Sequence, residues 1–460
     1  MHLSTKTGWL GHFRATVVLS LPLIGIHIAQ MLTHTTDVVM LGWYGVDELA
    51  AAVLASEIYF VVYLVGVGAA QAVMPMIANA HGADDSDRIR QVFRMGNWIT
   101  IAYAVAVLPV LLLAEPLLIV LGQSPHLSAL AGDYMQIAAW SMVPTLLVSM
   151  LRSLLSALRR PGIALIAILT GAAANALCNY ILIFGNWGAP ELGIRGAAIA
   201  TVVTGVLTTA ILFYTVKWIP ETSGRGLFKR LLKPNWTAFR EVLRLGWPIG
   251  LTLLAEAGLF SSSKVMVGWL GTIPLAAHGI VLQVVAICFM VPLGLSSAAT
   301  IRAGFAAGQR DHDGLKRGSM TSLALSMAIA LVAVALFLVF PESFVRLFLD
   351  QSHPETDRIV EIGITLFFVA AVFQVFDYLQ VVILGILRGV EDTKVPMILV
   401  ATSYWLIGAP MCLVLGFRFE FGAAGIWAGL AIGLCAAAVA LSIRLWRRLD
   451  ARAPGARTPA

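Results

Sequence analysis

The hexapeptide Met40-Leu-Gly-Trp-Tyr-Gly45 recurs 226 residues later as Met266-Val-Gly-Trp-Leu-Gly271. The same shift pairs Pro22 with Pro248, Gly68 with Gly294, and Gly82 with Gly308. A slightly larger shift, as loop insertions would produce, pairs Gln123-Ser124 with Gln351-Ser352, Leu158-Arg159 with Leu387-Arg388, and Gly193 and Gly196 with Gly422 and Gly425. The sequence therefore predicts two copies of one structural unit.

The composition is that of a membrane protein. Of the 460 residues, 59% are hydrophobic and 12% are charged, whereas a soluble domain carries roughly 25% charged residues. Apolar runs long enough to cross a bilayer recur along the whole chain, which leaves no room for a sizeable soluble domain. The net charge of +6 comes from basic residues scattered over short loops. Orientation in a membrane explains these residues better than a nucleic-acid partner does.

Hydropathy predicts twelve membrane-spanning helices. They cover residues 15–41, 49–80, 94–114, 129–151, 161–184, 193–217, 242–269, 274–302, 317–341, 359–386, 395–417 and 421–446. Each half has six spans, an even number, so the two halves enter the membrane in the same direction. We therefore expect an all-α polytopic protein whose two six-helix lobes are related by a parallel pseudo-twofold repeat, with a binding cleft between the lobes.

The distribution of basic residues predicts the orientation. With a cytoplasmic amino terminus, the inside segments hold 26 of the 31 lysines and arginines, so both termini are expected in the cytoplasm. The predicted organisation is an amino-terminal lobe (1–217), a cytoplasmic linker (218–241), a carboxy-terminal lobe (242–450) and a flexible tail (451–460). Within the linker, residues 226–233 could form a short interfacial helix or simply lie on the membrane surface.

Three acidic side chains, Asp37, Glu256 and Asp377, lie inside predicted spans. A charge at the bilayer centre costs about 2.5–3.5 kcal/mol on insertion scales, so such groups usually face a cavity or an ion path. The repeat does not preserve them, because Asp37 aligns with Ser263 and Glu256 with Gln30. We therefore expect the two lobes to have distinct duties in ion coupling.

A polar stripe follows the first span. His27, Gln30, His34 and Asp37 are spaced by three and four residues, which places them on one helical face. Either histidine could instead belong to a packed polar interface. A shared metal is disfavoured, because seven residues separate the histidines by about 10 Å along a helix.

The second lobe offers a carboxylate pair. Lys264 is the obvious counter-charge for Glu256, but eight residues correspond to about 12 Å, too far for a direct ion pair. Asp377 has no basic residue within two helical turns. A proton or a metal cation is its most plausible partner, and exchange between the two is what an antiporter needs.

Two further polar positions have open interpretations. Glu57 lies about two turns into the second span and could be functional or simply hydrated. Asn175 and Asn179 share a face of the fifth span, where they could contact a ligand or join neighbouring helices.

Common catalytic motifs are missing from the sequence. It has no GxxxxGK[ST] phosphate loop, so ATP does not drive this chain directly, and it has no nucleophile elbow, HExxH motif or paired zinc-ligand spacing. We therefore expect neither an enzyme nor a cofactor. An intramembrane metalloenzyme built on His27, His34 and Asp37 remains the alternative from another class.

Nearly all twelve spans resemble the multidrug and toxic compound extrusion (MATE) family, and within it the NorM-like branch. In the first half the resemblance is carried by Thr36-Asp-Val-Val-Met-Leu-Gly42, Met74-Pro75 with Gly82, and Asn175-Ala-Leu-Cys-Asn-Tyr180. In the second half it is carried by Glu256-Ala-Gly-Leu-Phe260, Val291-Pro-Leu-Gly294, Arg302-Ala-Gly304, Phe376-Asp-Tyr378, Leu387-Arg-Gly389 and Asp392-Thr-Lys394.

The resemblance implies export of amphipathic, often cationic drugs in exchange for inward Na⁺ or H⁺, across a bacterial inner membrane. Glu256 and Asp377 match the cation-coordinating acids of the family and would hold Na⁺ in a sodium-coupled protein, and Asp37 matches the acid of the amino-terminal lobe. The resemblance therefore implies that all three acids take part in cation coupling. The residues expected to line the substrate cavity are Gln30, His34, Glu57, Asn175, Asn179 and Phe373. At Phe373 family members often carry tyrosine, and at Glu57 a small residue.

The expected partners are small-molecule drugs, organic cations and membrane lipid, and a monomer is expected. A lipid-linked oligosaccharide flippase or polysaccharide exporter of related fold is the alternative function. Such a protein should have a basic cavity for pyrophosphate, whereas the predicted spans offer acids and only Lys264.

Overall fold

The computed structural model describes residues 8–223, 226–228, 233–350 and 354–450. In these ranges the chain is helical and contains no strand. The first half comprises α1 (Trp9–Tyr44), α2 (Val46–Gly82), α3 (Ser86–Leu112), α4 (Ala114–Val120), α5 (Pro125–Ala138), η1 (Ala139–Ser141), α6 (Met142–Ala157), α7 (Pro161–Phe184), η2 (Asn186–Gly188), α8 (Gly193–Trp218) and α9 (Pro220–Ser223). The second half comprises α10 (Trp236–Gly268), α11 (Thr272–Gly308), α12 (His312–Val339), α13 (Pro341–Arg346), α14 (Thr356–Gly389), α15 (Lys394–Thr402), η3 (Ser403–Gly408), α16 (Ala409–Leu413), η4 (Val414–Arg418) and α17 (Gly422–Asp450).

All twelve predicted spans are confirmed. The described residues contain twelve helices that are long and apolar enough to cross a membrane. Most of them extend beyond the predicted apolar segments, because hydropathy detects the apolar centre of a helix whereas the helix continues into polar end turns. The tail at 451–460 and part of the linker, including residues 229–232 of the possible interfacial helix, lie outside the described residues.

Two of the twelve spans are interrupted, and each contains a proline that removes one backbone hydrogen bond. The fourth span is formed by α5, the 3₁₀ turn η1 and α6, and Pro144 leaves the carbonyl of Trp140 in η1 without its helical partner. The eleventh span alternates α-helical and π-helical turns, and Pro410, which has no backbone N–H to donate, lies near the start of α16 directly after the π-helical turn η3. Hydropathy did not indicate these interruptions.

The repeat extends to local backbone geometry. Asp85 accepts a hydrogen bond from the Arg88 N–H at 2.9 Å and caps α3, and Asp311, 226 positions later, accepts from the Gly314 N–H at 2.9 Å and caps α12. A residue with positive φ precedes each cap, 55° at Asp84 and 57° at Arg310. An aspartate cap with its carboxylate at the helix amino terminus is favourable at both positions.

The chain divides into two compact units, which we call the N-terminal unit (Gly25–Leu251) and the C-terminal unit (Met1–Ile24 with Thr252–Ala460). The dividing points fall inside α1 and α10 rather than in the linker. The division into lobes at 1–217 and 242–450 with a linker between them stays a prediction.

The dividing points follow from two close backbone contacts. A Cβ atom at Gly68 of α2 would lie 2.4 Å from the Gly250 nitrogen and 2.5 Å from the Gly246 oxygen, both in α10. A Cβ atom at Gly294 of α11 would lie 2.6 Å from the Ile24 nitrogen in α1. The first part of α10 therefore packs within the N-terminal unit, and the first part of α1 packs within the C-terminal unit.

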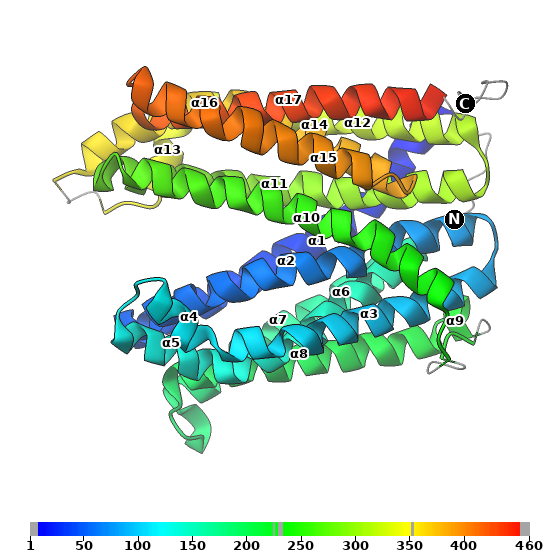
Figure 1. The fold of residues 1–460 in the computed structure, drawn as a ribbon, viewed down its shortest axis with the longest axis horizontal. Coiled ribbons are helices and arrows are strands. Elements are labelled where there is room, and N and C mark those ends of the chain that lie inside the picture. The colour runs from blue at the N-terminus through cyan, green and yellow to red at the C-terminus, as the bar shows by residue number, and fades with distance from the viewer. Residues whose placement is uncertain (1–7, 224–225, 229–232, 351–353, 451–460) are drawn as a thin grey trace. The chain divides into compact units, whose positions relative to one another are not determined.

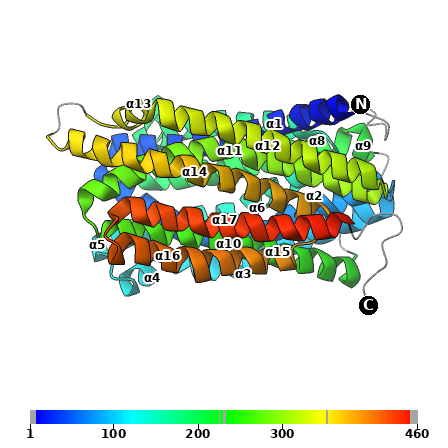
Figure 2. The ribbon, with the colours of Figure 1, turned by 90° about the horizontal axis from the view of Figure 1, so that it is seen from above.

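Each unit is a helical bundle with its own core (Figure 1). In the C-terminal unit α14 packs against α11, α12 and α17, and Figure 2 shows the same neighbours from above. In the N-terminal unit α2 packs against α3 and α6, and α8 packs against α6 and α7. The central helix of the C-terminal unit, α14, carries one of the three membrane acids.

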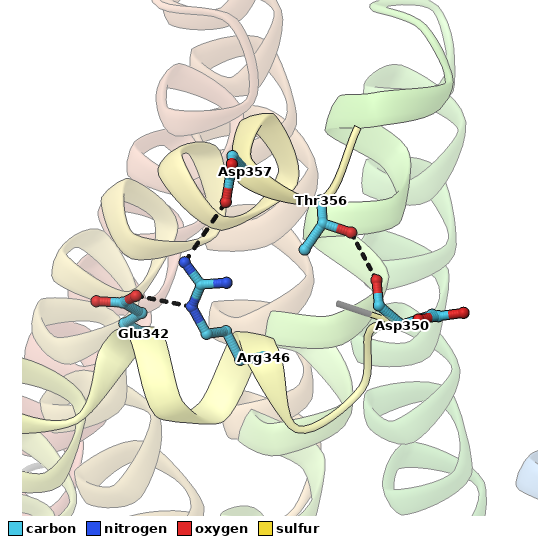
Figure 3. A network of polar contacts seen from close by, with 5 residues as sticks. All are labelled: Glu342, Arg346, Asp350, Thr356 and Asp357. Atoms are coloured by element: carbon cyan, nitrogen blue, oxygen red, sulfur yellow. Dashed lines mark hydrogen bonds and ion pairs between the residues drawn. The ribbon is translucent and has the colours of Figure 1, made fainter. Parts of the chain in front are cut away.

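Polar contacts fix the ends of the helices. In the C-terminal unit, Arg346 of α13 donates to Glu342 at 2.7 Å and to Asp357 at the start of α14 at 3.5 Å (Figure 3). The Thr356 hydroxyl donates to the Asp350 carbonyl at 2.8 Å. These bonds join the short helix α13 to the first turn of α14.

In the N-terminal unit, Arg160 and Glu221 join the start of α7 to α9 through an ion pair. Burial opposes ionisation of Glu221, but the hydrogen bond and charge of Arg160 prevail and hold the pKa of this carboxyl below its ordinary 4.5. A lowered pKa stabilises the fold above the unfolded value, and this contribution is lost as the pH falls through the folded value.

We expect Arg160→Gln to lower the free energy of unfolding by about 0.5 kcal/mol at pH 7, since exposed pairs contribute little. The difference between variant and wild type should shrink as the pH is lowered below 4.5. Thermal unfolding in detergent at about pH 7 and about pH 4 checks this, because these values lie on either side of the unfolded carboxyl pKa. A difference that is equal at both values would contradict an electrostatic origin.

Candidate functional site

The first part of the candidate site lies in the N-terminal unit around Asp37 of α1. This carboxylate is half-buried and accepts a hydrogen bond from the Asn179 amide nitrogen at 2.5 Å. The same nitrogen lies 3.2 Å from the Asn175 side-chain oxygen, one turn earlier on α7. Both asparagines are buried. The structure thus brings together three residues that the sequence placed on two separate helices, and the asparagines orient one oxygen of the acid.

A buried arginine adjoins the same polar face of α1. Arg152 of α6 is only 7% exposed, and its Nη1 donates to the Gln30 side-chain oxygen at 2.8 Å. Across the described part of the chain, no aspartate or glutamate forms an ion pair with this guanidinium. Arg152 lies one residue beyond the predicted fourth span, 129–151, whereas in the structure the helix α6 continues past it to Ala157. A charge inside the membrane costs a few kcal/mol, which makes it a functional candidate.

The remaining predicted polar residues of this unit are less closely connected. His27 is half-buried and within electrostatic range of Arg152. His34 is exposed on α1, and Glu57 is exposed on α2. In the described ranges neither forms a hydrogen bond or ion pair with Asp37. Their roles as cavity residues stay predictions.

The second part of the candidate site lies in the C-terminal unit. Asp377 of α14 is 2% exposed, and among the described residues its Oδ1 has no hydrogen-bond partner. Glu256 of α10 is half-buried and lies within electrostatic range of Asp377. Two carboxylates next to each other inside a membrane need a cation or a proton, because a buried charge without a partner is costly. The predicted pair is therefore brought together in one unit.

Arg388, near the end of α14, also acts electrostatically on Glu256. The sequence suggested Lys264 instead, and this lysine is exposed on α10 and forms no ion pair within the described ranges. Arg388 is far from Glu256 in the chain, so no local spacing could have indicated this electrostatic interaction. This arginine can balance one of the two negative charges and leaves the other available.

Phe373, one turn before Asp377, is fully buried in an aromatic cluster. Its ring centroid lies 6.0 Å from that of Phe260 and 5.5 Å from that of Trp427. The Trp427 indole donates to Nδ1 of His278 at 3.0 Å. The cluster joins α10, α11, α14 and α17 beside the carboxylates, and the predicted cavity role of Phe373 stays a prediction.

The described residues contain no group of three or more histidine, cysteine, aspartate or glutamate side chains that could hold a metal ion. Glu256 and Asp377 could contribute two carboxylate ligands to a transported cation, with the other ligands supplied by neutral oxygens, which hard cations accept.

The described residues form twelve helices that are long and apolar enough to cross a membrane, in two units with a parallel internal repeat. Together with carboxylates inside apolar helices, this arrangement defines the class of secondary membrane transporters. The MatE family model matches residues 22–181 and 248–414, one segment in each half. The chain belongs to this family, whose members are membrane transporters and not enzymes.

Two curated relatives match over almost the whole chain. One, from Agrobacterium fabrum, is 43% identical over 441 residues, which cover 96% of this chain and 95% of the relative. The other, from Rhizobium meliloti, is 42% identical over 445 residues, which cover 97% and 95%. Each is named "Probable multidrug resistance protein NorM".

Solved structures share the fold. A crystal structure of MATE in complex with MaL6 matches with a TM-score of 0.87 at 21% identity, covering 96% of this chain and 97% of that one. The eukaryotic MATE transporter AtDTX14 matches with a TM-score of 0.85 at 18% identity, covering 97% and 100%. The predicted all-α fold with twelve spans in two lobes is confirmed.

Proposed function

We propose that this protein is a secondary active multidrug efflux transporter that exports amphipathic, often cationic compounds in exchange for inward Na⁺ or H⁺ by alternating access. The names of its relatives support drug export. The observation that carries cation coupling is the buried Asp377, whose Oδ1 has no hydrogen-bond partner among the described residues, beside Glu256. The pair is built to exchange a cation for a proton.

The two parts of the candidate site have different functions. The pair Glu256 and Asp377 binds the coupling cation, while Asp37, held by Asn179, attracts the positive group of the drug. Inward movement of one charge down a potential of about 100 mV supplies about 2.3 kcal/mol. A cation shifts the conformational equilibrium only as far as its affinities for the two states differ. The carboxylate pair provides such a difference if its two side chains are close enough to share a cation in only one of the two states.

Membrane location, topology and oligomeric state are part of the proposal. We expect a bacterial inner membrane, both termini in the cytoplasm, and a monomer surrounded by lipid. A lipid-linked oligosaccharide flippase or polysaccharide exporter would need several cations around a pyrophosphate. Among the described residues of the N-terminal unit one arginine, Arg152, is buried, and in the C-terminal unit Arg388 acts electrostatically on Glu256. Drug export is therefore the better supported function.

Export in proteoliposomes tests the proposal. With ethidium as substrate, we expect either an imposed Na⁺ gradient or an imposed pH gradient, applied separately, to accelerate transport, and an ionophore that collapses that gradient to abolish it. The gradient that drives transport identifies the coupling ion. Ethidium movement that responds to neither gradient would overturn cation coupling.

A further inference from the structure

Arg152 is a cation that the proposed exchange of drugs for ions does not use. It is buried in α6 of the N-terminal unit, where Gln30 of α1 accepts its hydrogen bond at 2.8 Å. A glutamine oxygen satisfies one of the roughly five N–H donors of a guanidinium and leaves its charge uncompensated. Tyr63 of α2 lies within electrostatic range of the same group. Neither neighbour is an anion.

The neighbouring acid does not supply the missing charge. Asp37 lies seven residues after Gln30 on α1, which is two turns along the same helical face and about 10 Å away. Its carboxylate is bound by the Asn179 amide at 2.5 Å. The polar face of α1 therefore presents a positive group at Gln30 and a negative group at Asp37, each held by a different helix.

We propose that Arg152 is the anion-binding group of this site and that the site accepts zwitterionic amphipaths, with the substrate carboxylate at Arg152 and the positively charged group of the substrate at Asp37. The planar guanidinium binds carboxylates through paired hydrogen bonds. Gln30 orients the guanidinium, and the substrate carboxylate, a stronger hydrogen-bond acceptor, replaces the Gln30 oxygen when the substrate binds. The two groups meet α1 at positions that are two turns, about 10 Å, apart along the helix, so the substrate must carry its two charges on separate parts of the molecule.

This inference rests on the proposed function, because it assigns a ligand chemistry to the unit that holds Asp37. It goes beyond that function, since a purely cationic substrate needs Asp37 alone. Anion binding also explains why Arg152 lies inside an apolar helix without an acidic partner. A buried charge without a partner costs free energy, and binding of an anionic group offsets that cost.

Two dyes with the same ring system test separately whether the protein recognises the carboxylate and the positive charge of a substrate. Rhodamine B is a zwitterion at neutral pH, and its ethyl ester is a cation without the carboxylate. We expect wild-type protein in proteoliposomes to export both. Arg152→Gln should lower the initial rate for rhodamine B about 10- to 100-fold, the effect of losing a charge-assisted hydrogen bond, and leave the ester within about twofold. Arg152→Lys should retain part of the rhodamine B transport.

Arg244→Gln is the matched control, because it removes the same charge from an exposed position of the same unit. It should leave the ratio of the two rates unchanged. Dye binding to detergent-solubilised Arg152→Gln protein, followed by fluorescence anisotropy, should show the same selective loss of rhodamine B and does not depend on transport.

The outcomes are distinguishable. An equal loss of both dyes in Arg152→Gln, in transport and in binding, would show that Arg152 is structural and would overturn the inference. A wild-type protein that exports the ester but not rhodamine B would overturn the inference and leave the proposed function intact. A wild-type protein that exports ethidium but neither dye would overturn the inference alone, whereas one that exports neither dye and no ethidium under either gradient would overturn both.

Discussion

Asp377→Asn is expected to lower gradient-driven ethidium export at least about 100-fold, because the variant keeps the shape of the side chain and removes the charge that binds the coupling cation. A two-state transporter needs about 10⁴-fold differential binding to move from one dominant state to the other. Asp377 is 2% exposed, and in the described structure one of its oxygens has no hydrogen-bond partner. Its charge is therefore available to bind the coupling cation. Glu256 alone would remain beside Arg388.

The control for this variant lies in the same helix. Asp357→Asn makes the same chemical change in the first turn of α14, where the side chain is 90% exposed. We expect wild-type export from it. Ethidium binding should survive in Asp377→Asn, since Asp37 lies in the other unit. Export by Asp377→Asn at the wild-type rate under the driving gradient would refute cation coupling at this residue.

The fold was predictable because its signals are repeated along the sequence. The glycines at 193 and 196 align with those at 422 and 425. Gly193 and Gly422 both have positive φ, 53° and 58°, and Cβ atoms at Gly196 and Gly425 would each lie 2.4 Å from a backbone carbonyl oxygen. A position that admits only glycine is readable in sequence, and it marks the same helix packing in both halves.

Members of the candidate site were predictable where an acid lies inside an apolar span, as Glu256 and Asp377 do, or where spacing within one helix places polar residues on one face. Asn175 and Asn179 share a face of α7, and Asp37 belongs to a polar stripe, so their involvement could be inferred although their contact could not. Gln30 and Arg152 are 122 positions apart, and no periodicity joins them. Their hydrogen bond depends on how α1 packs on α6, which hydropathy does not encode.

Gly68→Ala is expected to destabilise the N-terminal unit by about 3 kcal/mol, near the upper end of overpacking costs. The added Cβ would lie 2.4 Å from the Gly250 nitrogen and 2.5 Å from the Gly246 oxygen. These are backbone atoms of α10, so no side-chain rotation can relieve the contact. The first part of α10 would have to move away from α2. Thermal unfolding in detergent and the yield of monodisperse protein measure the effect.

The repeat provides the second half of this prediction. Gly294→Ala should cost a similar amount, because its Cβ would lie 2.6 Å from the Ile24 nitrogen. In the same helix, α11, a methyl group added at Gly279 would meet no atom within 4 Å, so Gly279→Ala should be neutral or stabilising by up to about 1 kcal/mol through helix propensity. If all three variants unfold alike, the close contacts do not hold α1 and α10 in the units to which the structure assigns them. If only Gly68→Ala and Gly294→Ala unfold early, each unit depends on the first part of a helix that continues into the other unit.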